Sequence, residues 1–218
     1  GILCCAIVGY TNVGKSTLLN ALTNAGVLAE NKLFATLDIT SRSIELPDGR
    51  SVMLIDTVGL IRRLPHNLVE AFKSTLEEAS VADIILNVQD ISSPEREQQA
   101  EVTRNLLSEL GCDGIPQINV MNKADISMYT DTVFENDTTV LISAKQQTGF
   151  EKLLDCIMKN LPETSKRMKL LIPYDKTSFI NRIRTDGKIF SEEYTENGTL
   201  VDALVDVKLL KESEEYLC

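Results

Sequence analysis

A glycine-rich loop between a predicted strand and a predicted helix is the first feature that can do chemistry. The stretch "GYTNVGKS" has the spacing G-x-x-x-x-G-K-S. Its glycines let backbone N–H groups curl around a phosphate, and the N-terminus of the next helix adds positive potential. Lys15 then reaches the terminal phosphates, and the Ser16 hydroxyl is a ligand for Mg²⁺. A chance glycine turn is the alternative, and the strand–loop–helix context argues against it. The predicted phosphate-binding residues are Gly9, Tyr10, Thr11, Asn12, Val13, Gly14, Lys15, Ser16 and Thr17.

A second motif, "DTVG", begins at Asp56, where another apolar strand ends. An acidic side chain there can hold a water molecule on Mg²⁺, and the N–H of Gly59 can contact a γ-phosphate. Thr57 and Val58 complete the predicted loop. In Ras-like proteins a glutamine follows this glycine and orients the attacking water. The residue here is Leu60, which can neither donate nor accept a hydrogen bond.

The motif "NKAD" follows a later strand and predicts recognition of a base. The Asp125 carboxylate can accept both N–H groups on the N1/N2 edge of guanine. Adenine presents an acceptor and a C–H there, which would leave a buried carboxylate unpaired. We expect Asn122 to brace the loop and hydrogen-bond the base, and the stem of Lys123 to cover the face of the base.

A fourth motif, "SAK", follows the last strand of this region and completes the prediction. A backbone N–H within Ser143, Ala144 and Lys145 can meet O6 of guanine. A tetrapeptide such as NKAD occurs by chance, but four motifs in this order, each after a strand, predict a site for GTP or GDP.

These motifs are carried by a chain that alternates short apolar runs with helical patterns, which predicts a doubly wound, mostly parallel α/β sheet. Asp48-Gly49 marks an expected hairpin turn. The predicted strands are 2–9, 51–56, 83–90, 116–122 and 138–144. The predicted helices are 15–25 with Gly26 after its end, 66–80, a helix opened by a serine cap and Pro94 and closed at Gly111, and one from Gly149 that ends before Pro162.

The C-terminal part of the sequence predicts a second, smaller domain. We divide the chain into a nucleotide-binding domain at 1–162, a polar linker at 163–167 and a β-α-β-β domain at 168–218. In this domain Asp175 is expected to cap the helix and Asn197-Gly198 to form a hairpin turn.

Composition narrows the class of protein. The chain has 218 residues, is 43% hydrophobic and carries a net charge of −10, which argues against a non-specific nucleic-acid binder. No apolar run reaches the length of a membrane span. Local basic clusters are interpreted as solvated surface charge. They are Arg62 with Arg63, the set Lys166, Arg167 and Lys169, and Arg182 with Arg184.

The pattern of the five cysteines indicates the redox compartment of the protein. The cysteines are scattered, odd in number and never spaced as C-x-x-C, which favours reduced thiols in a cytoplasmic protein. Cys4 and Cys5 are expected in the core.

The chain begins at Gly1 without an initiator methionine, so we expect a piece of a longer protein.

At these motifs the chain resembles the translation-factor-related P-loop GTPases, and more narrowly the HflX family. The narrower resemblance rests on "NKLFATLDITSRSIELPDGR", "DTVGLIRRLPHNLVEAFKSTLEEA" and "EYTENG", and it covers nearly the whole chain. It implies a guanine-nucleotide switch that associates with the large ribosomal subunit and its RNA, largely through an N-terminal domain missing here. A role in splitting or rescuing ribosomes is part of that implication.

The resemblance also assigns a first switch segment at "FATLD", with Thr36 as the residue whose hydroxyl ligates Mg²⁺ when GTP is bound. It implies nucleotide contacts from this whole segment. Thr40 remains an alternative, because the sequence alone does not rank two nearby threonines. The family usually has Phe at Leu60 and Pro at Ile39, and both departures leave the ligand set intact. The residues of this segment are Phe34, Ala35, Thr36, Leu37 and Asp38.

Three sources of water positioning remain open without a glutamine. Asn12 resembles the loop asparagine of potassium-activated GTPases, so a K⁺ ion there would act as an arginine finger does; an Asn that merely shapes the loop is the alternative. Arg62 or Arg63 is a second candidate. A partner, here the ribosome, that orders both switch segments is the third, and it is favoured together with slow basal turnover. His66, the one histidine, is interpreted as a helix-terminus residue and not as a base.

Two further functions compete with a Mg²⁺-dependent GTPase switch. One is a GTP-sensing binding module with negligible hydrolysis. The other is an ATPase, for which an Asp125→Asn substitution would change nothing.

Overall fold

The computed structural model of the protein describes residues 3–25, 41–57, 79 and 81–218. The chain divides into two compact units. The first comprises Gly1–Leu46 and Ser51–Leu161, and the second comprises Pro47–Arg50 and Pro162–Cys218. Across the described ranges, no helix is long and apolar enough to cross a membrane.

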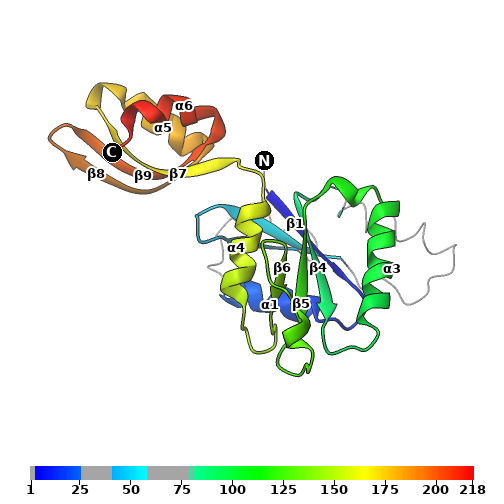
Figure 1. Cartoon of the computed structure of the whole chain (residues 1–218). Coiled ribbons are helices and arrows are strands. Elements are labelled where there is room, and N and C mark those ends of the chain that lie inside the picture. Colours follow the sequence, from blue (N-terminus) through cyan, green and yellow to red (C-terminus); the bar gives the residue numbers. More distant parts are fainter. Residues whose placement is uncertain (1–2, 26–40, 58–78, 80) are drawn as a thin grey trace. The chain divides into compact units, whose positions relative to one another are not determined.

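A six-stranded sheet forms the centre of the first unit (Figure 1). Its order is β2-β3-β1-β4-β5-β6, and every neighbouring pair is parallel except β2 with β3. The structure therefore confirms the predicted doubly wound, mostly parallel sheet. The strands are β1 (Leu3–Gly9), β2 (Ser41–Glu45), β3 (Ser51–Asp56), β4 (Ile84–Asp90), β5 (Gln117–Asn122) and β6 (Thr139–Leu141).

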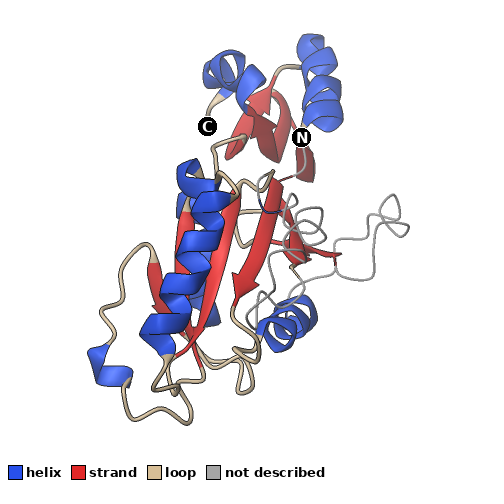
Figure 2. Cartoon of the chain, turned by 90° about the vertical axis from the view of Figure 1, so that its right-hand side faces the viewer, coloured by secondary structure: helices blue, strands red, loops and turns tan. Residues whose placement is uncertain are grey.

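Helices cover both faces of this sheet because its strands are apolar on both sides. Helices α1 (Lys15–Ala25) and α4 (Phe150–Asn160) pack on one face, and α3 (Arg96–Glu109) packs on the other. Figure 2 turns α3 toward the viewer, with the strands behind it. The helix predicted over 66–80 lies outside the described residues except for Ala79, which is buried.

The start of α3 differs from the prediction of a serine cap. Its N-cap residue is Glu95, which makes no side-chain capping bond. The Ser93 hydroxyl instead accepts the Glu95 N–H at 3.2 Å, and the Arg96 N–H donates to the Ser93 carbonyl. These bonds close a turn across Pro94 and delay the helix to Arg96. At the other end, Gly111 adopts the left-handed φ of 73° that the prediction requires of a terminating glycine.

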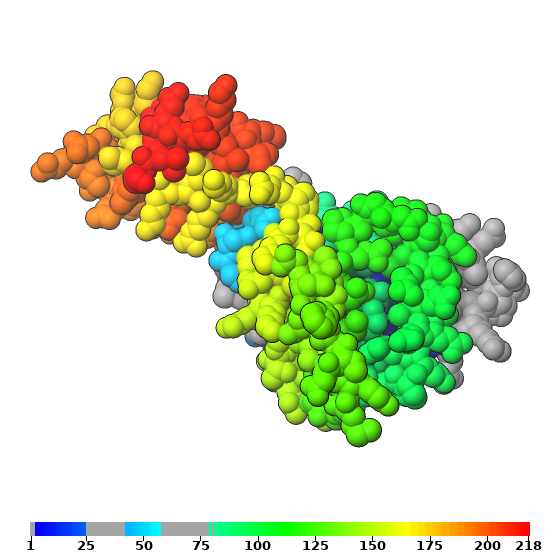
Figure 3. All heavy atoms as spheres, in the orientation of Figure 1, coloured from blue at the N-terminus to red at the C-terminus, as the bar shows by residue number. Residues whose placement is uncertain are grey.

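The crossover from β5 to β6 contains only a short 3-10 helix, Thr130–Thr132, among the described helices. With no amphipathic helix to pack its apolar side chains, Met128 is 88% exposed and Phe134 is 91% exposed. The space-filling view in Figure 3 shows this green segment on the surface of the first unit.

The second unit has a three-stranded antiparallel sheet in the order β7-β9-β8. Its core lies between this sheet and the helices. The elements are β7 (Ser165–Ile172), α5 (Thr177–Asp186), β8 (Lys188–Thr195), β9 (Gly198–Asp206) and α6 (Leu210–Ser213). The β-α-β-β order was predicted, and the C-terminal helix α6 was not.

Two local predictions in this unit are wrong. Strand β7 begins at Ser165 and pairs there with Asp206, so three of the five residues interpreted as a polar linker are strand residues. Their polarity misled the prediction because Lys166 and Arg167 are exposed while the backbone joins the ladder. Asp175 does not cap α5 either: it lies in a 3-10 turn, and the N-cap residue is Lys176.

Candidate nucleotide site

The glycine-rich loop runs from the end of β1 to the start of α1, as the motif requires. Two of its positions have no room for a side chain. A Cβ on Gly9 would lie 2.4 Å from the Val88 carbonyl oxygen, and a Cβ on Gly14 would lie 2.4 Å from Nδ2 of Asn122. Gly14 also has a φ of +101°, which favours glycine. The conformation of the loop is therefore fixed by close packing against Val88 of β4 and Asn122 of β5.

Lys15 is folded back into this loop. It is 7% exposed, and its Nζ donates to the carbonyl oxygens of Gly9 at 3.0 Å and Tyr10 at 2.8 Å. Burial lowers the pKa of its ammonium group, and the negative charge of Asp56 opposes this change. The loop thus holds a cation at the position where the motif places phosphates.

Ser16 and Asp56 meet beside this lysine. The Ser16 hydroxyl donates to Oδ2 of Asp56 at 3.1 Å. Oδ1 of Asp56 is buried and accepts no hydrogen bond within the described part of the chain. Burial raises the pKa of the Asp56 carboxyl, opposed by the Ser16 hydrogen bond and the charge of Lys15. A hydroxyl and a carboxylate oxygen without a partner are the hard oxygen donors that Mg²⁺ prefers, so these residues fit that ion.

The pairing of β1 with β3 brings Asp56 to this position. Ile7 lies opposite Asp56 in the parallel register. The next residue, Thr57, is fully buried, and both its N–H and its hydroxyl donate to the Ile7 carbonyl, at 3.2 and 2.7 Å. These two hydrogen bonds to β1 fix the backbone that directly follows Asp56.

Asn122 joins three loops at the end of β5. It is 2% exposed, its Nδ2 donates to the Val13 carbonyl at 2.8 Å, and its Oδ1 accepts the Ala144 N–H at 2.9 Å. The bracing role expected of Asn122 is therefore present: this side chain ties the phosphate loop to both predicted base-recognition motifs.

Asp125 is held by the loop after β6. The buried Ser143 hydroxyl donates to Oδ1 of Asp125 at 2.7 Å and accepts the Gln146 N–H at 3.1 Å. The Asp125 carboxylate is half-buried, whereas Lys145 is exposed. A carboxylate fixed in this way can accept two parallel N–H groups from a planar ligand.

Comparison with known proteins identifies the family. A family model described as "50S ribosome-binding GTPase" matches residues 4–123. GTPase HflX of Caldanaerobacter subterraneus is 46% identical over 212 residues, which are 97% of this chain and 49% of the relative. GTPase HflX of Lacrimispora saccharolytica is 49% identical over 208 residues, 94% of this chain and 49% of the relative. The chain belongs to the HflX GTPase family. It spans about half the length of these curated relatives.

Two solved structures are similar in fold to this HflX-family chain. A GTP-binding protein from Sulfolobus solfataricus in complex with GDP is 29% identical, with a TM-score of 0.59. It covers 72% of this chain, which in turn covers 52% of it. Era from Aquifex aeolicus bound to GDP and AlF4⁻ is 30% identical, with a TM-score of 0.56, and the match covers 74% of this chain and 57% of Era.

Asp90 also belongs to this candidate site, although the sequence analysis of this HflX-family chain missed it. Nζ of Lys123, the residue expected to cover the base, donates to the Asn12 carbonyl at 2.8 Å and to Oδ2 of Asp90 at 2.6 Å. Asp90 ends β4 directly beside Asn122 in the parallel register. The sequence offers only a weak signal for it, an aspartate at the carboxyl end of a predicted strand, where ligands of doubly wound sheets bind.

A pocket of about 320 Å³ adjoins the phosphate loop. Residues 10–13 form one wall, and Asp90 and Lys123 line it as well. Asn12 is exposed and has a left-handed φ of 61°. The remaining predicted residues lie outside the described part of the chain: Phe34, Ala35, Thr36, Leu37, Asp38, Thr40, Val58, Gly59, Leu60, Arg62, Arg63 and His66.

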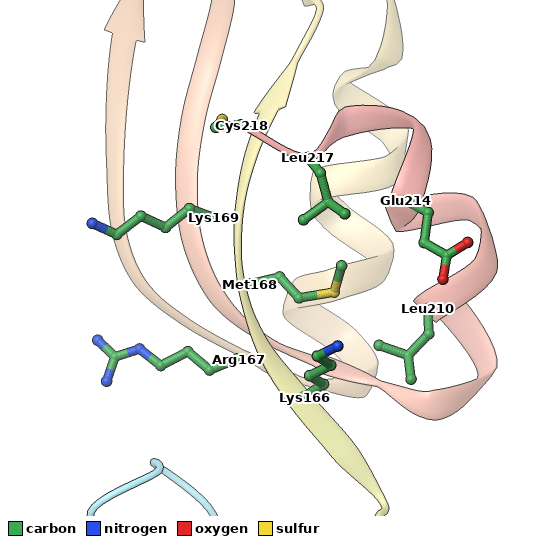
Figure 4. Close-up of a pocket in the computed structure, with 8 residues that line it drawn as sticks. All are labelled: Lys166, Arg167, Met168, Lys169, Leu210, Glu214, Leu217 and Cys218. Atoms are coloured by element: carbon green, nitrogen blue, oxygen red, sulfur yellow. The ribbon is translucent and has the colours of Figure 1, made fainter.

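The second unit contains a separate pocket of about 240 Å³ (Figure 4). Lys166, Met168 and Lys169 of β7 line it together with Leu217 and Cys218 of the C-terminal segment. None of the residues predicted to bind nucleotide belongs to it. None of the cysteines, all of which lie in the described ranges, forms a disulfide. Cys5, Cys112 and Cys156 are buried and Cys218 is exposed, and Cys4, which was expected in the core, is only half-buried.

Proposed function

We propose that this chain is the Mg²⁺-dependent GTP-binding and GTP-hydrolysing switch of an HflX protein that acts on the large ribosomal subunit in the cytoplasm. The observation that carries the proposal is the convergence of Lys15, Ser16 and Asp56 with Asn122 and Asp125 at the carboxyl ends of parallel strands. Ligands of doubly wound sheets bind at these ends. The family to which the chain belongs supports the same function.

The phosphate end of the nucleotide would lie in the loop from Gly9 to Ser16. Backbone N–H groups and the N-terminus of α1 supply positive potential there, and Lys15 exchanges its two carbonyl partners for phosphate oxygens. This exchange is favourable because a charged acceptor binds the ammonium group more strongly than a neutral carbonyl does.

Ser16, Asp56 through a water molecule, and Thr36 would hold Mg²⁺. The ion, when bound, neutralises charge on the β- and γ-phosphates. Asp56 must be ionised to serve it, and the negative charge that burial disfavours in the free protein is then compensated. The Gly59 N–H would contact the γ-phosphate, so both switch segments respond to its loss.

Guanine would be recognised by Asp125. Ser143 donates to one carboxylate oxygen of Asp125 and so fixes the plane of that carboxylate, in which the two N–H groups of guanine would bind. Ala144 is oriented by Asn122, and a backbone N–H in this loop would reach O6 of guanine. This arrangement supports GTP over ATP.

Slow basal turnover is expected because Leu60 stands where a water-orienting glutamine lies in Ras-like proteins. We propose that the ribosome orders the switch segments and accelerates hydrolysis. The same leucine supports a second candidate, a GTP-sensing module with negligible hydrolysis. Single-turnover hydrolysis with and without large ribosomal subunits separates the two candidates.

A potassium ion at Asn12 is a further proposed contributor to hydrolysis. GTPase rates in KCl and NaCl should then differ severalfold for the wild type and be equal for Asn12→Ala. Equal rates in both salts for the wild type would exclude a potassium site.

Ribosome association is the part of the proposal that concerns the whole protein. Because the chain spans about half of its relatives, we propose that much of the ribosomal contact lies in the remainder. Co-sedimentation of the longer protein with large subunits should be stronger with a GTP analogue than with GDP. Equal pelleting in both states would contradict a nucleotide-controlled association.

A further inference from the structure

Asp90 occupies a junction between the predicted phosphate and base loops. It ends β4 in register with Asn122 of β5, and the Ile91 N–H donates to the Asn122 carbonyl at 3.0 Å. Oδ2 of Asp90 lies 2.6 Å from Nζ of Lys123, and the same Nζ lies 2.8 Å from the Asn12 carbonyl oxygen. One ammonium group therefore connects the ends of β4 and β5 to the phosphate loop.

The Asp90 carboxylate is itself held in place. Its Oδ1 accepts the Ser92 N–H at 2.9 Å and the Ser92 hydroxyl at 2.5 Å, and its side chain is 15% exposed. Burial alone would raise the pKa of Asp90, but the hydrogen bonds from Lys123 and Ser92 outweigh it and lower the pKa. The group is thus an oriented anion and not a solvated surface charge.

Lys123, which carries this ammonium group, and Asn12, whose carbonyl accepts from it, both have unusual backbone conformations. Lys123 has a φ of 66° and Asn12 has a φ of 61°, in the left-handed region that residues other than glycine rarely adopt. Such conformations persist where surrounding bonds enforce them. The contacts from Lys123 to Asp90 and Asn12 are bonds of this kind.

A lysine without a fixed partner samples many rotamers, and ordering its side chain on ligand binding costs conformational entropy. Here the ammonium group is fixed at both sides before any ligand arrives. The four-carbon stem of Lys123 consequently has a set course between the Asp125 loop and the phosphate loop, which is the course a cover for the base would follow.

We propose that Asp90 is a positioning residue for guanine nucleotide, acting through Lys123 to clamp the phosphate loop to the base-recognition loop. This inference rests on the proposed nucleotide-binding function and adds to it a residue outside the four motifs. The clamp slows nucleotide release, because the base and phosphate ends of the site then move as one body.

Nucleotide dissociation rates of purified protein test the clamp. A fluorescent GDP analogue is loaded, chased with excess GDP, and its release is followed for the wild type, Asp90→Asn, Lys123→Met and the double variant. Asn at position 90 keeps an acceptor for Ser92 and loses the charge, and Met at position 123 keeps an apolar stem without the ammonium. We expect about tenfold faster release from Asp90→Asn, and association rates within about twofold of wild type.

Non-additivity distinguishes positioning from a general structural defect. If Asp90 acts through Lys123, the double variant releases the analogue no faster than Lys123→Met alone. Additive effects, or release from Asp90→Asn at the wild-type rate, would overturn the role of Asp90. Asp202→Asn is the matched control: it removes the partner of Arg167 in the second unit and should leave release unchanged.

The outcome for the wild type separates this inference from the function beneath it. Tight guanine-nucleotide binding by the wild type with unchanged release from Asp90→Asn contradicts the clamp alone. A wild type that binds no guanine nucleotide contradicts the proposed function and removes the clamp with it. Lys123→Met keeps the test decisive if Asp90→Asn does not fold, because loss of the ammonium must by itself accelerate release.

Discussion

Asp56 meets two opposed demands at the scale of a single residue. One of its oxygens is buried without a hydrogen bond in the described structure, and burial raises the pKa of its carboxyl group. A carboxyl group with a raised folded pKa binds its proton more tightly in the folded state. Its ionisation therefore lowers stability as the pH rises above the ordinary value of 3.8 and through the folded value. The proposed Mg²⁺ site depends on that same charge.

Asp56→Asn should accordingly separate stability from binding. Near neutral pH we expect the free energy of unfolding of the nucleotide-free variant to equal or exceed that of the wild type, because the buried charge is removed. The Mg²⁺-dependent part of nucleotide affinity should fall at least about tenfold, because a charged ligand is lost. Urea unfolding and nucleotide titration with and without Mg²⁺ measure the two effects. A less stable variant with unchanged Mg²⁺ dependence would refute this account of Asp56.

Asp125→Asn should relax base selection and spare the phosphate contacts. Loss of a carboxylate that accepts two N–H groups should weaken GDP binding by about tenfold or more and move the guanine-to-adenine affinity ratio toward one. Competition of GDP and ADP against a fluorescent nucleotide measures this ratio. A wild-type ratio already near one would support an ATP site.

The spaced motifs of the sequence point to candidate residues, and the structure brings the described ones together at the ends of parallel strands. Lys15 bonds to its own loop, Ser16 bonds to Asp56 of the second motif, and Asn122 bonds to the phosphate loop. Asp90 escaped because a lone aspartate after a strand has no pattern of its own, and its partner is 33 residues away. Only the register of β4 with β5 reveals the pair.

At the scale of elements, the site depends on how closely strand ends approach the phosphate loop. Asn122 at the end of β5 reaches the loop through its Nδ2, and the same atom fills the space beside Gly14. The glycine and the asparagine thus form one packing unit, in which neither residue can change its size alone.

Gly14→Ala should therefore destabilise the first unit. The added Cβ meets Asn122 at 2.4 Å on a backbone with a φ of +101°, so we expect a loss of about 1–3 kcal/mol in free energy of unfolding. Gly114→Ala is the matched control, since a Cβ there meets nothing within 4 Å, and its effect should stay below about 0.5 kcal/mol. Chemical unfolding followed by circular dichroism measures the free energy of unfolding of both variants. Equal losses in the two variants would show that the Asn122 side chain moves aside without cost.

Elements were predictable where the hydrophobic pattern was uninterrupted. Strand β3 has the predicted bounds because its residues are apolar on both faces and a hairpin turn precedes it. Strand β7 was predicted three residues short because Lys166 and Arg167 are both exposed near its start, so the strand has no apolar alternation there. Helix α6 spans only four residues, too few for a helical period to be visible.

At the scale of the whole molecule, the described site residues all belong to the first unit, while the second unit has its own sheet and core. The sequence indicated a separate C-terminal domain from its β-α-β-β pattern. It could not indicate what that unit binds, because its motifs carry no chemistry. The net charge of −10 argues against broad, non-specific binding of nucleic acid by this chain.

Single-turnover GTP hydrolysis, measured with and without purified large ribosomal subunits, tests the central claim most directly. With Leu60 in place of a glutamine, we predict slow hydrolysis by the protein alone and at least tenfold faster hydrolysis when large subunits are added. The accelerated rate should disappear in Lys15→Ala. GTP that stays bound and unhydrolysed, with and without large subunits, would contradict the assignment of this chain as a GTPase switch.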